Sequence, residues 1–225
     1  MKLYFGTGVR RQENDITFSN EVLLELFEKT CNNPIFSDWS EMQINRFNEV
    51  YDEFNFEKIT KAINSPKKDL CVFCYGEGSE LVFSRDKINY NISLKFSQET
   101  LENKISVFRD FMVEVALSMP QFDQLIGSSG REVYDYQKEQ HLPEEKSIFG
   151  YMSWLNVLSP LGYKKYYEKE DLLSAPFYDV REIAPDIVFI QSTKDPFDIK
   201  DEESLNYLRN GVNHLNKNLL FFKYK

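Results

Sequence analysis

The sequence has few of the residues that most often carry catalysis or bind metals. It contains two histidines, His141 and His214, and three cysteines among 225 residues. Neither histidine lies in an HExxH or HxE context, and a serine or cysteine nucleophile without a histidine lacks its usual base. An odd number of cysteines in a domain of this size favours a reducing compartment over a disulfide framework. We therefore expect a cytoplasmic protein that is not an enzyme, with no catalytic residues, no cofactor and no metal.

The chain also lacks long apolar runs and an excess of positive charge. Its longest apolar runs, such as 219–222, are far shorter than the roughly 20 residues that span a bilayer, and its N-terminus becomes charged before a signal-peptide core forms. The 27 Lys and Arg against 36 Asp and Glu give a formal charge of -9. Such a surface repels phosphate backbones and anionic lipid, although many cytosolic proteins are acidic for solubility alone. We expect no direct nucleic-acid binding and no membrane binding, whereas a basic protein would be attracted.

Apolar and aromatic residues are plentiful enough for a substantial core. Hydrophobic residues make up 42% of the chain and aromatic residues 15%, with 19 Phe and 13 Tyr. A chain of this length buries roughly 70% of its unfolded surface when it folds. We expect one compact domain, 1–225, made of an N-terminal half, 1–136, and a C-terminal half, 147–225. The polar segment 137–146 is the predicted linker between the halves.

Hydrophobic periodicity predicts helices and strands in both halves. In the first half we expect strands at 2–9, 69–75 and 87–96, helices at 20–32 and 100–119, and a helical pattern from 42 to 63 that breaks near 55. A strand is then expected at either 122–126 or 132–136. In the second half we expect strands at 151–158, 178–183, 186–193 and 218–224, and helices within 160–175 and at 201–215. Each half then has the order βαββαβ, which predicts an α+β fold with two ferredoxin-like halves and largely antiparallel sheets.

Three short motifs suggest chemistry, and each has a simpler structural interpretation. Cys71 and Cys74 have the spacing of a redox or zinc half-site, but residues three apart on a strand point to opposite faces. Pro185-Asp186, with Lys194 eight residues later, partly resembles the metal-binding acids of nucleases, but Ser192 stands where a second acid is needed. The loop 127–131 is glycine-rich and ends in arginine, so it suits an anion, although a plain flexible loop explains it better.

Two groups of residues are the best candidates for a protein-binding surface. Tyrosine supplies contact area with a polar tip at low entropic cost, and interfaces are enriched in it. The first group is a set of three tyrosines between residues 163 and 167. The second group is a set of five acids within the nine residues 195–203, which would attract a basic partner. Packing over the sheet explains the tyrosines about as well, and helix capping explains the acids. The candidate protein-binding surface comprises Tyr163, Tyr166, Tyr167, Asp195, Asp198, Asp201, Glu202 and Glu203.

Several strings in the second half are similar to a known family. Trp154-Leu-Asn-Val-Leu-Ser159 after Gly150, the strand 187–191 that ends in Ile-Gln, and the turn Asp195-Pro-Phe-Asp198 resemble the immunity protein 52 family. Its members are antitoxins of bacterial polymorphic toxin and type VI secretion systems. The resemblance covers about a third of the chain and implies a cytoplasmic inhibitor of a cognate toxin, often a nuclease that is basic where it meets DNA. The resemblance implies no catalytic residues. It also implies that Trp154 lies in the core and that Asn156 holds backbone in place.

The leading hypothesis is therefore an immunity protein that neutralises a toxin effector, with a nuclease toxin as the expected partner. The alternative hypothesis is a small-ligand-binding or enzymatic domain that uses the cleft between two ferredoxin-like halves. A nuclease that depends on Asp186 is a third interpretation. Sequence does not decide between a monomer and a homodimer.

Overall fold

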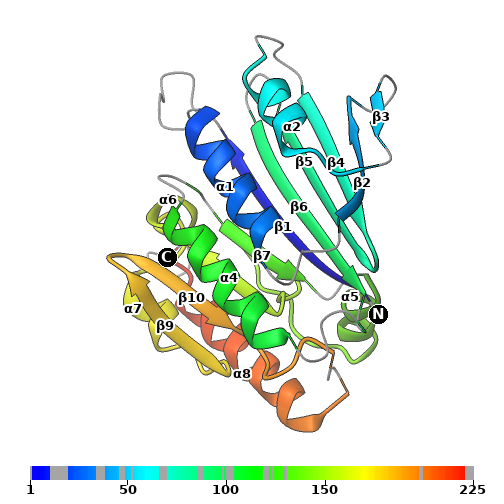
Figure 1. The fold of residues 1–225 in the computed structure, drawn as a ribbon. Coiled ribbons are helices and arrows are strands. Elements are labelled where there is room, and N and C mark those ends of the chain that lie inside the picture. The colour runs from blue at the N-terminus through cyan, green and yellow to red at the C-terminus, as the bar shows by residue number, and fades with distance from the viewer. Residues whose placement is uncertain are drawn as a thin grey trace. The chain divides into compact units, whose positions relative to one another are not determined.

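The computed structural model describes residues 2–10, 20–33, 39–45, 49–51, 53–65, 70–85, 89–97, 99, 104–118, 122, 124–128, 131–197 and 200–220. The chain folds into two compact units. The first unit is Tyr4–Gln121, and the second unit is Phe122–Lys225 together with Met1–Leu3 (Figure 1). The predicted linker, 137–146, therefore lies inside the second unit.

The first unit contains an antiparallel sheet with the strand order β3-β2-β4-β5-β6, and β1 lies beside β6. The strands are β1 (Lys2–Arg10), β2 (Trp39–Ile44), β3 (Glu49–Tyr51), β4 (Leu70–Gly76), β5 (Ser79–Arg85) and β6 (Asn89–Ser97). Strands β4, β5 and β6 form a meander, in which Leu81 pairs with both Cys74 and Leu94. The tight turn between β4 and β5 requires Gly78, whose φ is +73°.

The helices of the first unit are α1 (Asn20–Asn32), α2 (Phe56–Ile63) and α4 (Ile105–Ser118). In Figure 1, α1 and α2 lie in front of the strands of this unit. Helix α2 begins where Asn55 caps it, with the side-chain oxygen accepting a hydrogen bond from the backbone N–H of Lys58 at 3.1 Å. Phenylalanines fill the core, and Phe27 contacts Phe83 edge-on at a ring separation of 6.4 Å.

The helical prediction for the segment that begins at residue 42 is wrong. The segment that contains Met42 and Ile44, expected to be helical, forms strands β2 and β3 instead. Met42 and Ile44 are both buried, with Gln43 between them less so, which is the period of two that a strand requires. Pairing of Met42 with Cys74 on β4 then fixes the register. The helical pattern holds only after residue 55.

The second unit contains an antiparallel sheet with the strand order β7-β8-β10-β9. Its strands are β7 (Gln124–Ser128), β8 (Leu155–Leu158), β9 (Asp179–Ala184) and β10 (Ile187–Gln191), and its helices are α5 (Arg131–Glu139), α6 (Pro160–Tyr163), α7 (Lys169–Leu173) and α8 (Glu202–Asn218). Strands β8, β9 and β10, with the helical crossover between β8 and β9, follow the predicted ferredoxin-like path.

The strand that lies beside β8, on the side away from β10, differs from the prediction. A ferredoxin-like unit places its last strand beside its first, and we expected residues 218–224 to supply it. Here β7, which precedes β8 in the chain, occupies that position. Helix α8 instead continues through Asn218, and residues 221–225 lie outside the described part of the chain. The α+β class, a division into two halves and the antiparallel sheets are confirmed. The first unit does not have the predicted βαββαβ order, because β2 and β3 lie between α1 and α2 and the meander β4–β5–β6 follows α2.

Two further segments of the second unit were predicted with alternatives. A strand was expected at 122–126 or at 132–136, and β7 overlaps the first range. The second range is helical, in α5, where Val133, Tyr136 and Gln137 recur at helical spacing. Among the helices that the structure describes, none is long and apolar enough to cross a membrane.

The core of the second unit lies where α8 packs on the sheet. Leu208, Val212 and Leu215 from α8 meet Leu158, Val188 and Ile190 from the strands, all of them buried. Asp201 caps α8, with its carboxylate accepting a hydrogen bond from the N–H of Ser204 at 2.9 Å. This acid therefore stabilises the helix that closes the core.

Candidate protein-binding surface

Two of the three tyrosines predicted for the surface lie in the core. Tyr163 is 1% exposed and Tyr167 is fully buried, so the expectation that they are exposed is wrong. Tyr166 is half-buried against the same core, and its backbone carbonyl accepts a hydrogen bond from the N–H of Leu220. Tyr163 is the last residue of the short helix α6, and Tyr166 and Tyr167 lie in the segment that follows it. Sequence spacing alone did not show which way this segment faces.

Tyr167 organises a loop through a buried carboxylate. The side chain of Glu145 is only 3% exposed, and it accepts hydrogen bonds from the backbone N–H groups of Ser147, Ile148 and Phe149 at 3.0, 2.7 and 2.7 Å. The hydroxyl of Tyr167 donates to the same carboxylate. Burial and the neighbouring carboxylate raise the pKa of Tyr167 above its usual range. Tyr167 is therefore a determinant of the fold.

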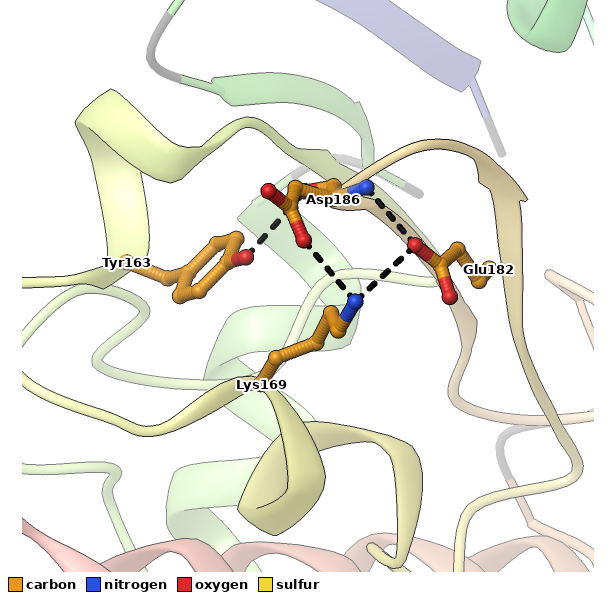
Figure 2. Close-up of polar contacts among 4 residues, drawn as sticks. All are labelled: Tyr163, Lys169, Glu182 and Asp186. Carbon is orange, nitrogen blue, oxygen red and sulfur yellow. Dashed lines mark hydrogen bonds and ion pairs between the residues drawn. The ribbon is translucent and has the colours of Figure 1, made fainter.

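Tyr163 supports a charged cluster at the turn between β9 and β10. Figure 2 shows Lys169 between two carboxylates, with its Nζ 2.8 Å from Asp186 and 3.1 Å from Glu182. Glu182 also accepts a hydrogen bond from the N–H of Asp186 at 2.7 Å, and the Tyr163 hydroxyl donates to the Asp186 carbonyl at 3.2 Å. Asp186 has a φ of +63°, a conformation that aspartate tolerates in tight turns.

The ion pairs of this cluster shift the pKa values of its members. The hydrogen bond from Lys169 lowers the pKa of Asp186, and the hydrogen bond from the Asp186 backbone lowers the pKa of Glu182. The two carboxylates raise the pKa of Lys169 above its usual range. The cluster therefore stays fully ionised over the physiological pH range and holds the hairpin turn against α7.

The residues that the sequence suggested for metal or redox chemistry have structural roles in the folded chain. The carboxylate of Asp186, central to the nuclease interpretation, is engaged by Lys169. In the described part of the chain, no three His, Cys, Asp or Glu side chains gather as a metal site would require. Cys74 is fully buried on β4, and burial raises the pKa of its thiol to about 12, so the reactive thiolate does not form at neutral pH.

The predicted acids divide between structural and exposed roles. Asp195 accepts a hydrogen bond from the N–H of Phe197 at 2.8 Å, which forms a turn, and Asp201 is the cap of α8. Glu202 and Glu203 are exposed in the first turn of that helix. Asp198 lies outside the described residues. Of the predicted surface, Glu202 and Glu203 are the fully exposed members.

The structure also exposes tyrosines that lie outside the predicted surface. Tyr178 is 40% exposed and contacts Tyr207 edge-on, at a ring separation of 5.8 Å. Tyr134 is 45% exposed and contacts Tyr151 edge-on, at 4.7 Å. The sequence carried a signal for one member of the first pair, Tyr207. It lies four residues after Glu203 on a helix, so the two side chains share a face.

The strings that carried the family resemblance hold the second unit together. Trp154 is 3% exposed, and its indole N–H donates to the carbonyl of Thr193 at 3.0 Å. Asn156 donates to the carbonyl of Ser153 at 3.1 Å and accepts from the side chain of Gln124 at 3.2 Å. Both expectations for these residues, a core tryptophan and a backbone-tying asparagine, are confirmed.

Comparison of the fold with solved structures adds one finding. The chain resembles a T6SS protein. The Pseudomonas aeruginosa T6SS protein PA0821 superposes with a TM-score of 0.56 over 92% of this chain and 73% of that one, at 10% sequence identity. At that identity the likeness concerns the fold. No protein-family model and no curated protein sequence matches the chain.

Proposed function

We propose that the chain is an immunity protein that binds and neutralises a cognate toxin effector of a type VI secretion or related polymorphic toxin system. The observation that carries this proposal is the likeness of fold to a T6SS protein across 92% of the chain. The resemblance of the strings around Trp154 and Asp195 to the immunity protein 52 family supports the same class.

The surface chemistry suits a basic protein partner. The formal charge of -9 draws a positively charged protein toward the chain and accelerates association. A nuclease toxin is basic where it binds DNA, so an acidic inhibitor can occupy or flank that surface. The exposed ring of Tyr178, the partly buried Tyr207 and the exposed carboxylate of Glu203 supply contact area and charge in one place.

Binding to a toxin domain, sought among the proteins encoded beside this gene, tests the proposal. Isothermal titration calorimetry with an active-site-disabled form of that domain should give a 1:1 complex with a dissociation constant in the nanomolar range or tighter. Co-expression with the active toxin should restore growth of the host cell. The proposal would be wrong if the chain neither bound the toxin domain nor restored growth of the host cell.

A cavity in the first unit favours a second candidate function, the binding of a small anion. The cavity has a volume of about 300 Å³ and is lined by Ile44, Asn45, Tyr51, Lys58, Lys61, Ala62, Ser65 and Leu70. The ammonium group of Lys58 lies 3.6 Å from the centre of the Tyr51 ring. A ligand that binds only the folded state raises the melting temperature. A thermal-shift series with inorganic phosphate and benzoate, each compared with Lys58→Met, tests this candidate, and unchanged melting temperatures would remove it.

A further inference from the structure

One face of α8 carries a row of three residues spaced by four. Glu203, Tyr207 and Gly211 lie one above the other, because residues four apart on a helix share a face. The ring of Phe177 packs directly on Gly211: a Cβ at that position would lie 2.2 Å from the ring. Only glycine leaves room for the ring, which is 6% exposed there.

The close packing at Gly211 positions the residue that follows Phe177. Tyr178 then lies one helical turn closer to the start of α8, and its ring meets Tyr207 at an interplanar angle of 86°. The hydroxyl of Tyr207 in turn donates to the carboxylate of Glu203 at 3.2 Å, and this hydrogen bond raises the pKa of Tyr207. We name Tyr178, Tyr207 and Glu203 the Tyr178 patch.

The Tyr178 patch presents an aromatic face and a negative charge at fixed positions. Tyr178 remains 40% exposed, although burying a ring of this size is favourable. None of the ion pairs between residues that the structure describes uses Glu203. A positively charged partner atom would therefore meet a carboxylate already oriented by Tyr207, with little further loss of side-chain entropy.

We propose that the Tyr178 patch receives an arginine side chain of the partner protein, an inference that rests on the proposed function. A guanidinium group is planar, so it stacks on the exposed ring of Tyr178 while its N–H groups donate to Glu203. Lysine offers a point charge without the planar face. Glu202, also exposed in the same helical turn, adds to the negative potential that guides the arginine in.

The second exposed tyrosine pair also has a carboxylate partner, because Tyr151 hydrogen-bonds to Glu144, but a neighbouring lysine makes the pair less suited to an arginine. Tyr134 lies on α5 four residues before Lys138, which is exposed on the same helix face. The ammonium group of Lys138 repels an incoming guanidinium. The Tyr134 pair therefore serves as the matched control: an edge-to-face tyrosine pair with similar exposure in the same unit.

The test measures binding of single variants to the disabled toxin domain encoded beside this gene. Tyr178→Ala should weaken binding at least tenfold, and Glu203→Gln about three- to tenfold with a reduced dependence on salt. Tyr178→Phe should bind as the wild type does, because it keeps the ring that the guanidinium stacks on. Tyr134→Ala and Glu139→Gln should leave binding within about twofold.

The outcomes separate this inference from the proposed function. Tight binding of the wild-type chain with unchanged binding of Tyr178→Ala and Glu203→Gln would overturn the arginine contact and leave the immunity function standing. A loss with Tyr134→Ala in place of Tyr178→Ala would overturn it equally. Lack of binding by the wild-type chain removes both. If Tyr178→Ala fails to fold, the exposed helix variant Glu203→Lys decides, and it should abolish tight binding by charge repulsion.

Discussion

At the scale of single residues, the second unit depends on a few polar and small side chains in its core. Glu145 and Tyr167 show how a buried carboxylate is accommodated, since backbone N–H groups and one phenol hydroxyl satisfy its oxygens. Gly211 shows the opposite case, in which the absence of a side chain makes room for a ring. Hydrophobic periodicity predicts neither feature, because it registers large apolar side chains and not a buried carboxylate or a glycine.

Replacement of Tyr167 by phenylalanine should destabilise the chain by about 1–3 kcal/mol, because the buried Glu145 carboxylate loses a donor without gaining water. Urea unfolding followed by circular dichroism measures the change. Tyr166→Phe, at the neighbouring half-buried position, is the matched control and should change stability by less than about 0.5 kcal/mol. Equal stabilities for Tyr167→Phe and the wild type would contradict the role given to this hydroxyl.

Gly211→Ala should also destabilise the chain by about 1–3 kcal/mol, although alanine is the better helix former. The new methyl group would displace the Phe177 ring from α8. Asn210→Ala, one residue earlier and exposed, should be neutral or slightly stabilising. A thermal melt that ranks Gly211→Ala above the wild type would show that the ring moves aside without cost.

At the scale of elements, the hairpin of β9 and β10 is held at its turn by charge. Lys169 reaches from α7 to Glu182 on β9 and to Asp186 in the turn. Because both carboxylates have lowered pKa values in the folded chain, their contribution to stability is present above their unfolded pKa values. It is lost as the pH falls through the folded values.

Lys169→Met should therefore reduce stability at pH 7, and the difference from the wild type should shrink as the pH falls through the lowered pKa values of Glu182 and Asp186. The partners are exposed, so solvent screening keeps the difference small. Melting temperatures measured from pH 3 to pH 7 provide the comparison. Lys165→Met, an exposed lysine nearby, should show no such pH-dependent difference; a constant gap for Lys169→Met would argue against the ion pairs.

Sequence patterns predicted many of the elements that have an apolar face, although they missed β5, in which Leu81 and Phe83 are buried. The helix at 20–32, the strands around 70–76 and 89–97 and the hairpin at 179–191 are all present. The segment 42–51 was misassigned, because its apolar spacing fits a helix loosely and only tertiary pairing with β4 selects the strand. The candidate surface was harder to predict, since the exposure of Tyr163, Tyr166 and Tyr167 depends on which way α6 and the segment after it face.

At the scale of the whole molecule, the acidic surface is the property that most directly shapes partner choice. A formal charge of -9 creates a field that extends about one Debye length, or about 8 Å at physiological ionic strength. Such a field acts before contact, so it selects basic partners and accelerates their approach more than it strengthens the final complex.

Association with the proposed toxin domain should therefore slow as salt increases, with a drop in the association rate constant of about tenfold or more between about 50 and 500 mM NaCl. The dissociation rate constant should change much less. Stopped-flow fluorescence measures the association rate constant, and surface plasmon resonance measures the dissociation rate constant. An association rate that does not respond to salt would show that electrostatic attraction plays no part in finding the partner.

The position of β7 has a consequence for how the protein is made. In the usual ferredoxin-like arrangement the strand beside the first one comes last, so the sheet waits for the end of the chain. Here β7 precedes β8, and the strands β7, β8, β9 and β10 of the described part of the second unit all precede α8 in the chain. The sheet can therefore pair as soon as these strands have left the ribosome, without a strand from the end of the chain, and α8 then closes over a surface that is already formed.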